Sequence, residues 1–142
     1  MVSEEITRDE RKTLSVLAFL LFRMGQEARA KRLYEAIAEL SESGSADWRL
    51  ARAGVAAIAV ETGDGTTALA ALRDAMKGAS LSTRDAALWL LKARALWMQG
   101  RREEAEAARD EFLYLSGEAS KAAQREQEAR ESQESKNNNR KS

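Results

Sequence analysis

The side chains that could do acid–base chemistry are carboxylates, and three of them, Glu103, Glu104 and Glu106, lie close together in the sequence. A carboxyl group works as a general acid near neutral pH only when its surroundings raise its pKa. These three follow Arg101 and Arg102 and belong to the first turn of an expected helix. Acidic residues at that position usually offset the helix dipole and stay solvated. We therefore expect no catalytic site here.

Two other charged clusters give equally little reason to expect a binding site. Glu35 and Glu39 are one helical turn apart, but a single carboxylate pair on an outer helix face is typical of a solvated surface rather than a metal site. The short basic run Arg101–Arg102 is followed directly by acidic residues, and 23 basic residues balance 23 acidic ones over the chain. This balance does not favour nucleic acid as a partner. The sequence predicts no metal, no cofactor and no nucleic-acid partner.

The composition excludes several classes of site. The 142 residues include no cysteine, histidine or proline. Disulfides, zinc sites built from Cys and His, and catalytic triads that need either residue are therefore excluded. Residues 1–11 are polar and acidic, unlike a signal peptide, and the longest apolar run, Val16–Phe22, is too short to span a bilayer. We expect no direct insertion into a membrane.

Hydrophobic periodicity and turn residues predict an all-α chain of six helices without a strand. Capping boxes at Thr7–Glu10 and Ser82–Asp85 are expected to open the first and fifth helices. The first and fifth helices are apolar on nearly all sides, so each must be covered on more than one side. The predicted helices cover residues 10–24, 26–40, 47–61, 68–76, 85–99 and 103–115.

Beyond residue 116 the composition changes. Residues 117–142 contain no Leu, Ile, Val, Met or aromatic residue and therefore have no apolar stripe to bury. Residues 119–134 could be helical by propensity, whereas residues 136–142 are expected to be disordered. The predicted organisation is a helical domain over residues 1–116 followed by a polar tail over residues 117–142.

Three glycines divide the helices into pairs. Gly25, Gly63 and Gly100 end the first, third and fifth helices at intervals of 38 and 37 residues, and an alanine follows five residues after each. A helix-turn-helix repeat of about this length is typical of a helical solenoid, and the tetratricopeptide repeat of about 34 residues is the nearest class. The predicted fold is three helix-turn-helix pairs that form a short right-handed solenoid with a concave groove.

The first helix of each pair lines the concave surface of a tetratricopeptide solenoid, and its uncovered face is expected to look into the groove. Large aromatic residues at the two ends, with small residues between them, suit an apolar segment of another protein, such as a helix. The alternative is that the same side chains fill a tight core or a homodimer seam. Leu17 and Leu33 are expected between helices instead. The candidate groove residues are Ser15, Phe19 and Phe22, then Ala53, Ala57 and Val60, then Leu90, Arg94, Trp97 and Met98.

Two segments resemble a known family. TRDERKTLSVLAFLLFRMGQEARAKRLYEAI (7–37) and LWLLKARALWMQGRREEAEAARDEFLYL (88–115) resemble the small tetratricopeptide chaperones of bacterial type III secretion systems, and among them the SctY (YscY) family. The likeness rests on the glycine turn before the ERA-like Glu27–Ala30 and on the closing aromatic–leucine segment Phe112–Leu115. The alanine-rich middle pair and the polar tail depart from that pattern.

The resemblance implies a cytoplasmic, non-enzymatic protein. Such a chaperone would bind a small secreted SctX-like partner in its groove, and the pair would engage the export-gate protein SctV. Separately from the resemblance, an apolar groove left empty is expected to favour self-association, such as a homodimer, when the partner is absent. Two related functions, a chaperone of the needle subunit or of the translocators, remain open, as does a tetratricopeptide interaction scaffold outside secretion.

Overall fold

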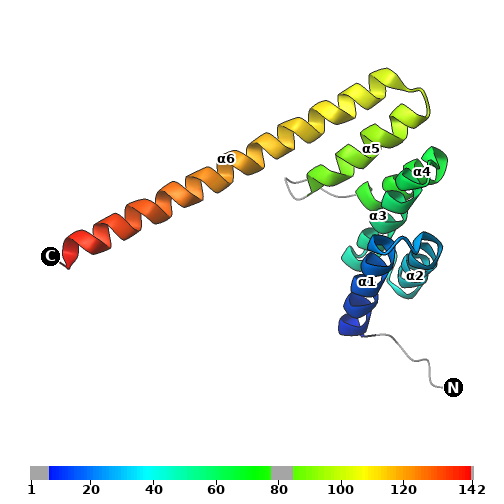
Figure 1. Cartoon of the computed structure of the whole chain (residues 1–142), viewed down its shortest axis with the longest axis horizontal. Helices are drawn as coiled ribbons and strands as arrows, with labels where there is room; N and C mark the ends of the chain where they lie inside the picture. The colour runs from blue at the N-terminus through cyan, green and yellow to red at the C-terminus, as the bar shows by residue number, and fades with distance from the viewer. Residues whose placement is uncertain (1–6, 78–84, 142) are drawn as a thin grey trace.

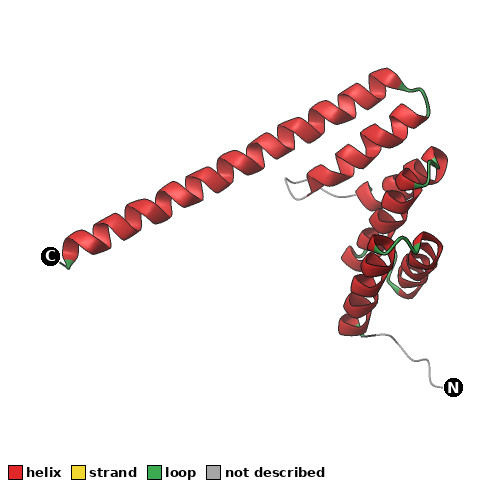
Figure 2. Cartoon of the chain, viewed as in Figure 1, coloured by secondary structure: helices red, strands yellow, loops and turns green. Residues whose placement is uncertain are grey.

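A computed structural model of the chain describes residues 7–77 and 85–141, and all regular secondary structure in those ranges is helical (Figure 1; Figure 2). The predicted all-α class is therefore confirmed for the described part of the chain. The first five helices agree with the predicted ranges to within three residues at each end. Within these ranges no helix combines the length and the apolar character needed to cross a membrane. The helices are α1 (Arg8–Arg23), α2 (Glu27–Leu40), α3 (Ala46–Glu61), α4 (Gly65–Met76), α5 (Ala86–Met98) and α6 (Arg102–Arg140).

The turns that follow α1, α3 and α5 have the same geometry. Gly25, Gly63 and Gly100 have φ angles of 79°, 79° and 74°, in the left-handed region that glycine adopts without a steric penalty. In each turn the N–H after the glycine donates to the carbonyl oxygen five residues earlier, as in a Schellman C-cap. The repeat in the sequence is therefore also a repeat in the backbone. These bonds join Gln26 to Leu21 (2.8 Å), Asp64 to Ala59 (2.8 Å) and Arg101 to Leu96 (3.0 Å).

The alanine that follows each glycine by five residues is buried. Ala30 and Ala68 are 0% exposed and Ala105 is 4% exposed. Each lies in the first turn of α2, α4 or α6, where a side chain no larger than a methyl group lets the second helix approach the first closely. This explains why the three pairs share the residue.

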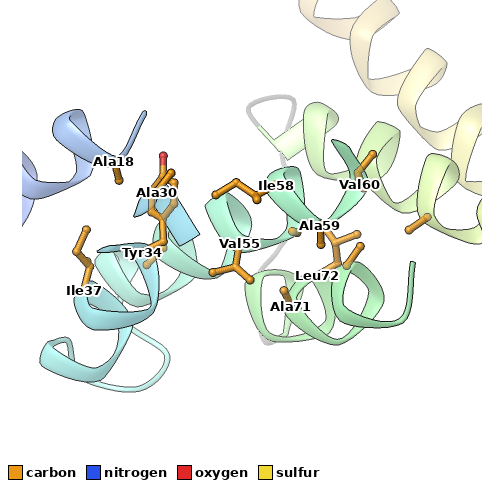
Figure 3. Close-up of a cluster of buried hydrophobic side chains, with 14 residues drawn as sticks. Ala18, Ala30, Tyr34, Ile37, Val55, Ile58, Ala59, Val60, Ala71 and Leu72 are labelled. Atoms are coloured by element: carbon orange, nitrogen blue, oxygen red, sulfur yellow. The ribbon is translucent and has the colours of Figure 1, made fainter. Parts of the chain in front are cut away.

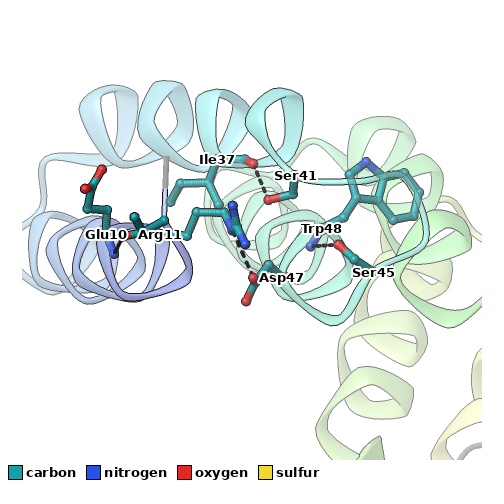
Figure 4. Close-up of polar contacts among 8 residues, drawn as sticks. Glu10, Arg11, Ile37, Ser41, Ser45, Asp47 and Trp48 are labelled. Carbon is teal, nitrogen blue, oxygen red and sulfur yellow. Dashed lines mark hydrogen bonds and ion pairs between the residues drawn. The ribbon is translucent and has the colours of Figure 1, made fainter. Parts of the chain in front are cut away.

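Two first helices begin at hydroxyl caps. The Thr7 hydroxyl oxygen accepts from the Glu10 N–H at 3.2 Å, and the Ser45 hydroxyl oxygen accepts from the Trp48 N–H at 3.2 Å (Figure 4). Each bond satisfies an N–H that has no partner within its helix. The predicted cap at Thr7 is thus confirmed, whereas Ser82 of the second predicted box lies outside the described residues.

Helix α4 begins three residues earlier than predicted because Asp64 caps it. The Asp64 carboxylate accepts from the Thr67 N–H at 3.1 Å, and hydrogen bonding to Thr67 lowers the pKa of Asp64. Gly65 follows and is buried; a Cβ built there would lie 2.9 Å from Gln99 Nε2 and 3.2 Å from the Ala95 carbonyl oxygen. Only glycine lets the start of α4 lie this close to α5.

Consecutive helices pack against one another, and α3 is central. It contacts α1, α2, α4 and α5, whereas α2, α4 and α6 make no contact with one another. Figure 1 shows the hairpin of α5 and α6 leading away from the group of α1 to α4. The first helices thus form a continuous row, and the second helices lie apart.

The main core is built largely of alanine around α3 (Figure 3). Ile37, Val55 and Leu72 are its largest fully buried side chains. Gly54 on α3 lies against the ring of Tyr34, where a Cβ would come within 2.6–2.7 Å of three ring carbons, and burial raises the pKa of Tyr34. A smaller cluster joins α5 to α6. It consists of Ala93, Leu96, Ala105 and Ala108.

Helix α6 corrects the predicted tail. It continues past residue 115 to Arg140, so the prediction of disorder is wrong for residues 136–140. Residues 102–115 pack on α5 and supply the costly helix nucleus, after which each added residue needs only propagation. Helix formers and pairs such as Lys121–Glu118 (3.7 Å) and Gln127–Glu131 (3.2 Å) favour this continuation. We call residues 117–140 the overhang.

The prediction for Leu17 is also corrected. Leu17 is 46% exposed, whereas Leu33 is partly buried and packs against the main core as expected. Among the described helices, only α2 and α3 contact α1, so a helix that is apolar on nearly all sides leaves part of its apolar surface in solvent. The apolar residues do not by themselves show which side that is.

Candidate functional site

Nine of the ten predicted groove residues lie at or near the surface, and they come from α1, α3 and α5. Phe19 is 53% exposed, Trp97 58%, Met98 40% and Leu90 39%. Arg94 is also exposed, and Ser15, Phe22, Ala53 and Ala57 are half-buried. Phe22 packs against the main core, as Leu33 does, and is therefore left out of the surface. We define the first-helix surface as the exposed or half-buried side chains Ser15, Phe19, Leu50, Ala53, Ala57, Leu90, Arg94, Trp97 and Met98.

Val60 does not belong to this surface. It is 4% exposed and forms part of the main core cluster, so its assignment to an open groove is wrong (Figure 3). Val60 corresponds to Phe22 and Trp97 by its distance from the glycine turn. Because α3 has neighbours on both sides along the row, this position is buried on α3, whereas it is half-buried on α1 and 58% exposed on α5.

Leu50 is the residue that sequence reasoning missed. It is 58% exposed and precedes Ala53 and Ala57 by three and seven residues on α3. That spacing puts all three on one helix face, so the periodicity that identified the alanines could have identified the leucine. Leu50 adds a large apolar side chain to the middle of the first-helix surface.

Two ion pairs join the first helices along this row. Arg11 Nε of α1 lies 3.0 Å from Asp47 Oδ2 of α3 (Figure 4), and Arg94 Nη1 of α5 lies 3.4 Å from Glu61 Oε1 of α3. Arg94 itself belongs to the first-helix surface. The uncovered faces of α3 and α5 therefore border one another, and the apolar residues have a charged edge.

Trp97 is held at the end of the surface by a cation. The Arg102 guanidinium lies over its ring, 5.3 Å from the ring centre, across the α5–α6 turn. Such stacking favours a fixed ring position at an exposed site. Trp97 thus presents a large and oriented apolar side chain to solvent.

A separate hollow of about 790 Å³ lies between α4, α5 and α6. Leu72, Met76 and Leu96 are among its apolar lining residues, and Arg73 and Lys92 are among its charged ones. Trp89 also lines it, beneath the Lys92 ammonium at 4.9 Å from the ring centre, and the Trp89 indole N–H is buried without a hydrogen-bond partner among the described residues. The hollow shares no lining residue with the first-helix surface, so the two are separate features of the molecule.

Two of the carboxylates singled out in the sequence, Glu104 and Glu35, are engaged in ordinary surface pairs. Glu104 accepts from Arg101 Nη2 at 2.8 Å, and this hydrogen bonding lowers the pKa of Glu104, the opposite of what a general acid needs. Glu35 lies 3.9 Å from Lys31 Nζ. Among residues 7–77 and 85–141, no three His, Cys, Asp or Glu side chains are grouped so that they could hold a metal ion.

A scan of the chain against protein-family models finds no match, and a search of curated proteins finds no significant match.

Proposed function

We propose that the chain is a tetratricopeptide-like adaptor in which the pairs α1–α2, α3–α4 and α5–α6 stack as a short right-handed solenoid. The three equivalent glycine turns support this arrangement. The order of helix contacts supports it too, because first helices contact one another and second helices do not. In a stack of this kind the first helices lie on the concave side.

The observation that carries the proposal is the exposure of large apolar side chains on the first-helix surface. Phe19, Leu50 and Trp97 are each more than half exposed, and they come from three different first helices. Soluble monomers rarely expose contiguous apolar patches beyond a few hundred Å² unless the patch binds something. This surface therefore binds an apolar segment of another protein.

The size pattern of the surface favours a helix as that segment. Ala53 and Ala57 leave room beside Leu50 on α3, while Phe19 on α1 and Trp97 on α5 stand at the two ends. An amphipathic helix binds such a groove through apolar anchors spaced three or four residues apart. The Arg94–Glu61 pair would lie at its polar edge.

The proposed partner is a small secreted SctX-like protein of a type III secretion system. The segments that resemble SctY-family chaperones form α1–α2 and most of α5 with the packed part of α6, and they include Phe19 and Trp97. In this proposal the protein is non-enzymatic and acts in the cytoplasm. It keeps its partner soluble by covering an apolar surface, and the pair then engages SctV.

Co-expression with an SctX-like protein, a needle subunit and a translocator, followed by co-purification, tests the proposal. We expect the SctX-like protein to co-purify and Trp97→Glu to raise its Kd about 100-fold, because the apolar contact of the Trp97 ring would be lost and a carboxylate would be desolvated in its place, at a cost of roughly 3 kcal/mol. Leu113→Glu is the matched control, since Leu113 is 56% exposed on α6 and lies off the surface. It should leave binding unchanged.

Circular dichroism of each free variant separates binding from folding. Trp97→Glu should keep the wild-type helical signal, whereas Leu33→Glu should lose it because Leu33 packs against the main core. Unfolding of Trp97→Glu would show that Trp97 is a core residue. A folded Trp97→Glu variant with undiminished affinity would place the binding site elsewhere, and failure of all three candidates to co-purify would contradict the secretion assignment.

A further inference from the structure

A second apolar face of α1 lies outside the first-helix surface. It consists of Val16 (56% exposed), Leu17 (46%), Leu20 (50%) and Met24 (72%). The spacings of four residues from Val16 to Leu20 to Met24, with Leu17 beside them, put these side chains on one side of the helix. We call this set the α1 end face.

The corresponding face of α3 is covered by a helix. The glycine turns align α1 with α3 at an offset of 38 residues, so Leu17 and Leu20 correspond to Val55 and Ile58. Val55 is 1% exposed and Ile58 is 2% exposed. Val16 corresponds to Gly54, which lies against Tyr34 of α2. On α3 this face is therefore covered by α2, the second helix of the preceding pair.

The same relation holds on α5. At an offset of 37 residues from α3, Ile58 corresponds to Ala95, which is 0% exposed. The Ala95 carbonyl oxygen lies close to Gly65 at the start of α4. Among the described residues, no helix covers this face on α1. The equivalent face thus occurs on α1, α3 and α5. A helix of the preceding pair covers it on α3 and α5, whereas on α1 it is uncovered.

Exposed charges at the two ends of α1 favour a particular partner. Asp9 lies in its first turn and Arg23 in its last, both exposed and both flanking the same side of the end face. In an antiparallel pair of α1 helices, with a twofold axis level with Val16 and Leu17, Asp9 of each copy faces Arg23 of the other. Leu20 then faces Thr13. A parallel pair would instead place Asp9 against Asp9.

We propose that the α1 end face binds a second copy of this chain through an antiparallel α1–α1 contact. The contact is isologous, so one apolar stripe and one charge pair are used twice. A single helix from each copy buries less than the roughly 1,600 Å² of a standard interface, so the dimer is weak and depends on concentration. The first-helix surface is left free for the proposed partner.

Sedimentation of the full chain over a range of concentrations tests the proposal. We expect a monomer–dimer equilibrium, and Leu20→Glu should raise the dimer Kd about a hundredfold or more, because each copy would bury a carboxylate against Thr13 of the other. Helical signal should persist, since Leu20 is half exposed. Leu113→Glu, at an equally exposed leucine on α6, should leave the dimer unchanged.

Charge reversal tests the antiparallel register. Asp9→Arg alone and Arg23→Asp alone should each raise the dimer Kd about tenfold, because both symmetric pairs become repulsive. The double variant should restore the wild-type value, and addition of 0.5 M salt should reduce all three differences. A monomer at every concentration, or a dimer that survives Leu20→Glu, would overturn the proposal, and absence of rescue in the double variant would overturn the register.

The result is distinguishable from that of the proposed function. Trp97→Glu should weaken partner binding about 100-fold and leave the dimer intact, while Leu20→Glu should weaken the dimer and leave partner binding intact. Loss of the dimer in Trp97→Glu would mean that the copies meet through the first-helix surface, and the α1 end face would then carry no contact.

Discussion

Helix α3 and the overhang of α6 are helical for different reasons. Helix α3 contacts four other helices and buries Ala51, Val55, Ala56, Ile58, Ala59 and Val60. Residues 120–140 of the overhang are exposed throughout, and Figure 1 shows α6 continuing beyond the end of α5. Packing stabilises α3 despite the glycine at its centre, whereas the overhang depends on helix propensity and on the nucleus supplied by residues 102–115.

The two regions are expected to contribute unequally to the free energy of unfolding, with the larger share from the residues packed around α3. Burial of apolar area is the dominant favourable term in folding, so changes near α3 should cost stability. Equal changes on exposed parts of α6 should not. Matched substitutions in the two regions therefore test whether the free energy of unfolding depends on packing around α3 and not on the exposed part of α6.

The largest effect is expected from Leu72→Ala, whose wild-type side chain is 1% exposed beside α3. Removing it loses burial and leaves a cavity, so the free energy of unfolding should fall by about 2–5 kcal/mol. Leu113→Ala is the control, at a leucine 56% exposed on α6, and should change it by less than about 0.5 kcal/mol. Urea titration followed by circular dichroism measures both. Equal losses would show that α6 is packed as tightly as the centre.

An intermediate effect is expected from Ser45→Ala at the start of α3. The Ser45 hydroxyl accepts from the Trp48 N–H at 3.2 Å, and loss of this cap should lower the free energy of unfolding by about 1 kcal/mol. Ser135→Ala in the overhang should be neutral or slightly stabilising, because alanine has the higher helix propensity. The same urea titration reports both values. A neutral Ser45→Ala would mean that water replaces the cap without loss.

The smallest effect on stability is expected from deleting residues 117–142. The total helical signal should fall in proportion to the residues removed, but the Tm should change little because the deleted segment buries no apolar surface. Thermal melting of the full and shortened chains measures this. A fall in Tm of more than about 4 °C would show that the overhang packs against the repeats or a second copy.

Local features were readable from the sequence. The glycine turns, the cap at Thr7 and the first five helix ranges agree with the structure. Each depends on backbone geometry or on side chains within a few residues of one another. The overhang was predicted less well because helix propagation from a packed segment depends on α5, which is distant in the sequence from residue 140.

The sequence by itself determined the six helices and the three equivalent turns, since hydrogen bonds between near neighbours and the left-handed φ of glycine are local properties. Only the tertiary structure decided which apolar faces are covered. Leu17 and Val55 occupy equivalent repeat positions and are both apolar, yet one is 46% and the other 1% exposed. The difference arises because α2 precedes α3 in the stack, whereas no described helix lies on the same face of α1, and burial depends on that neighbour rather than on the residue.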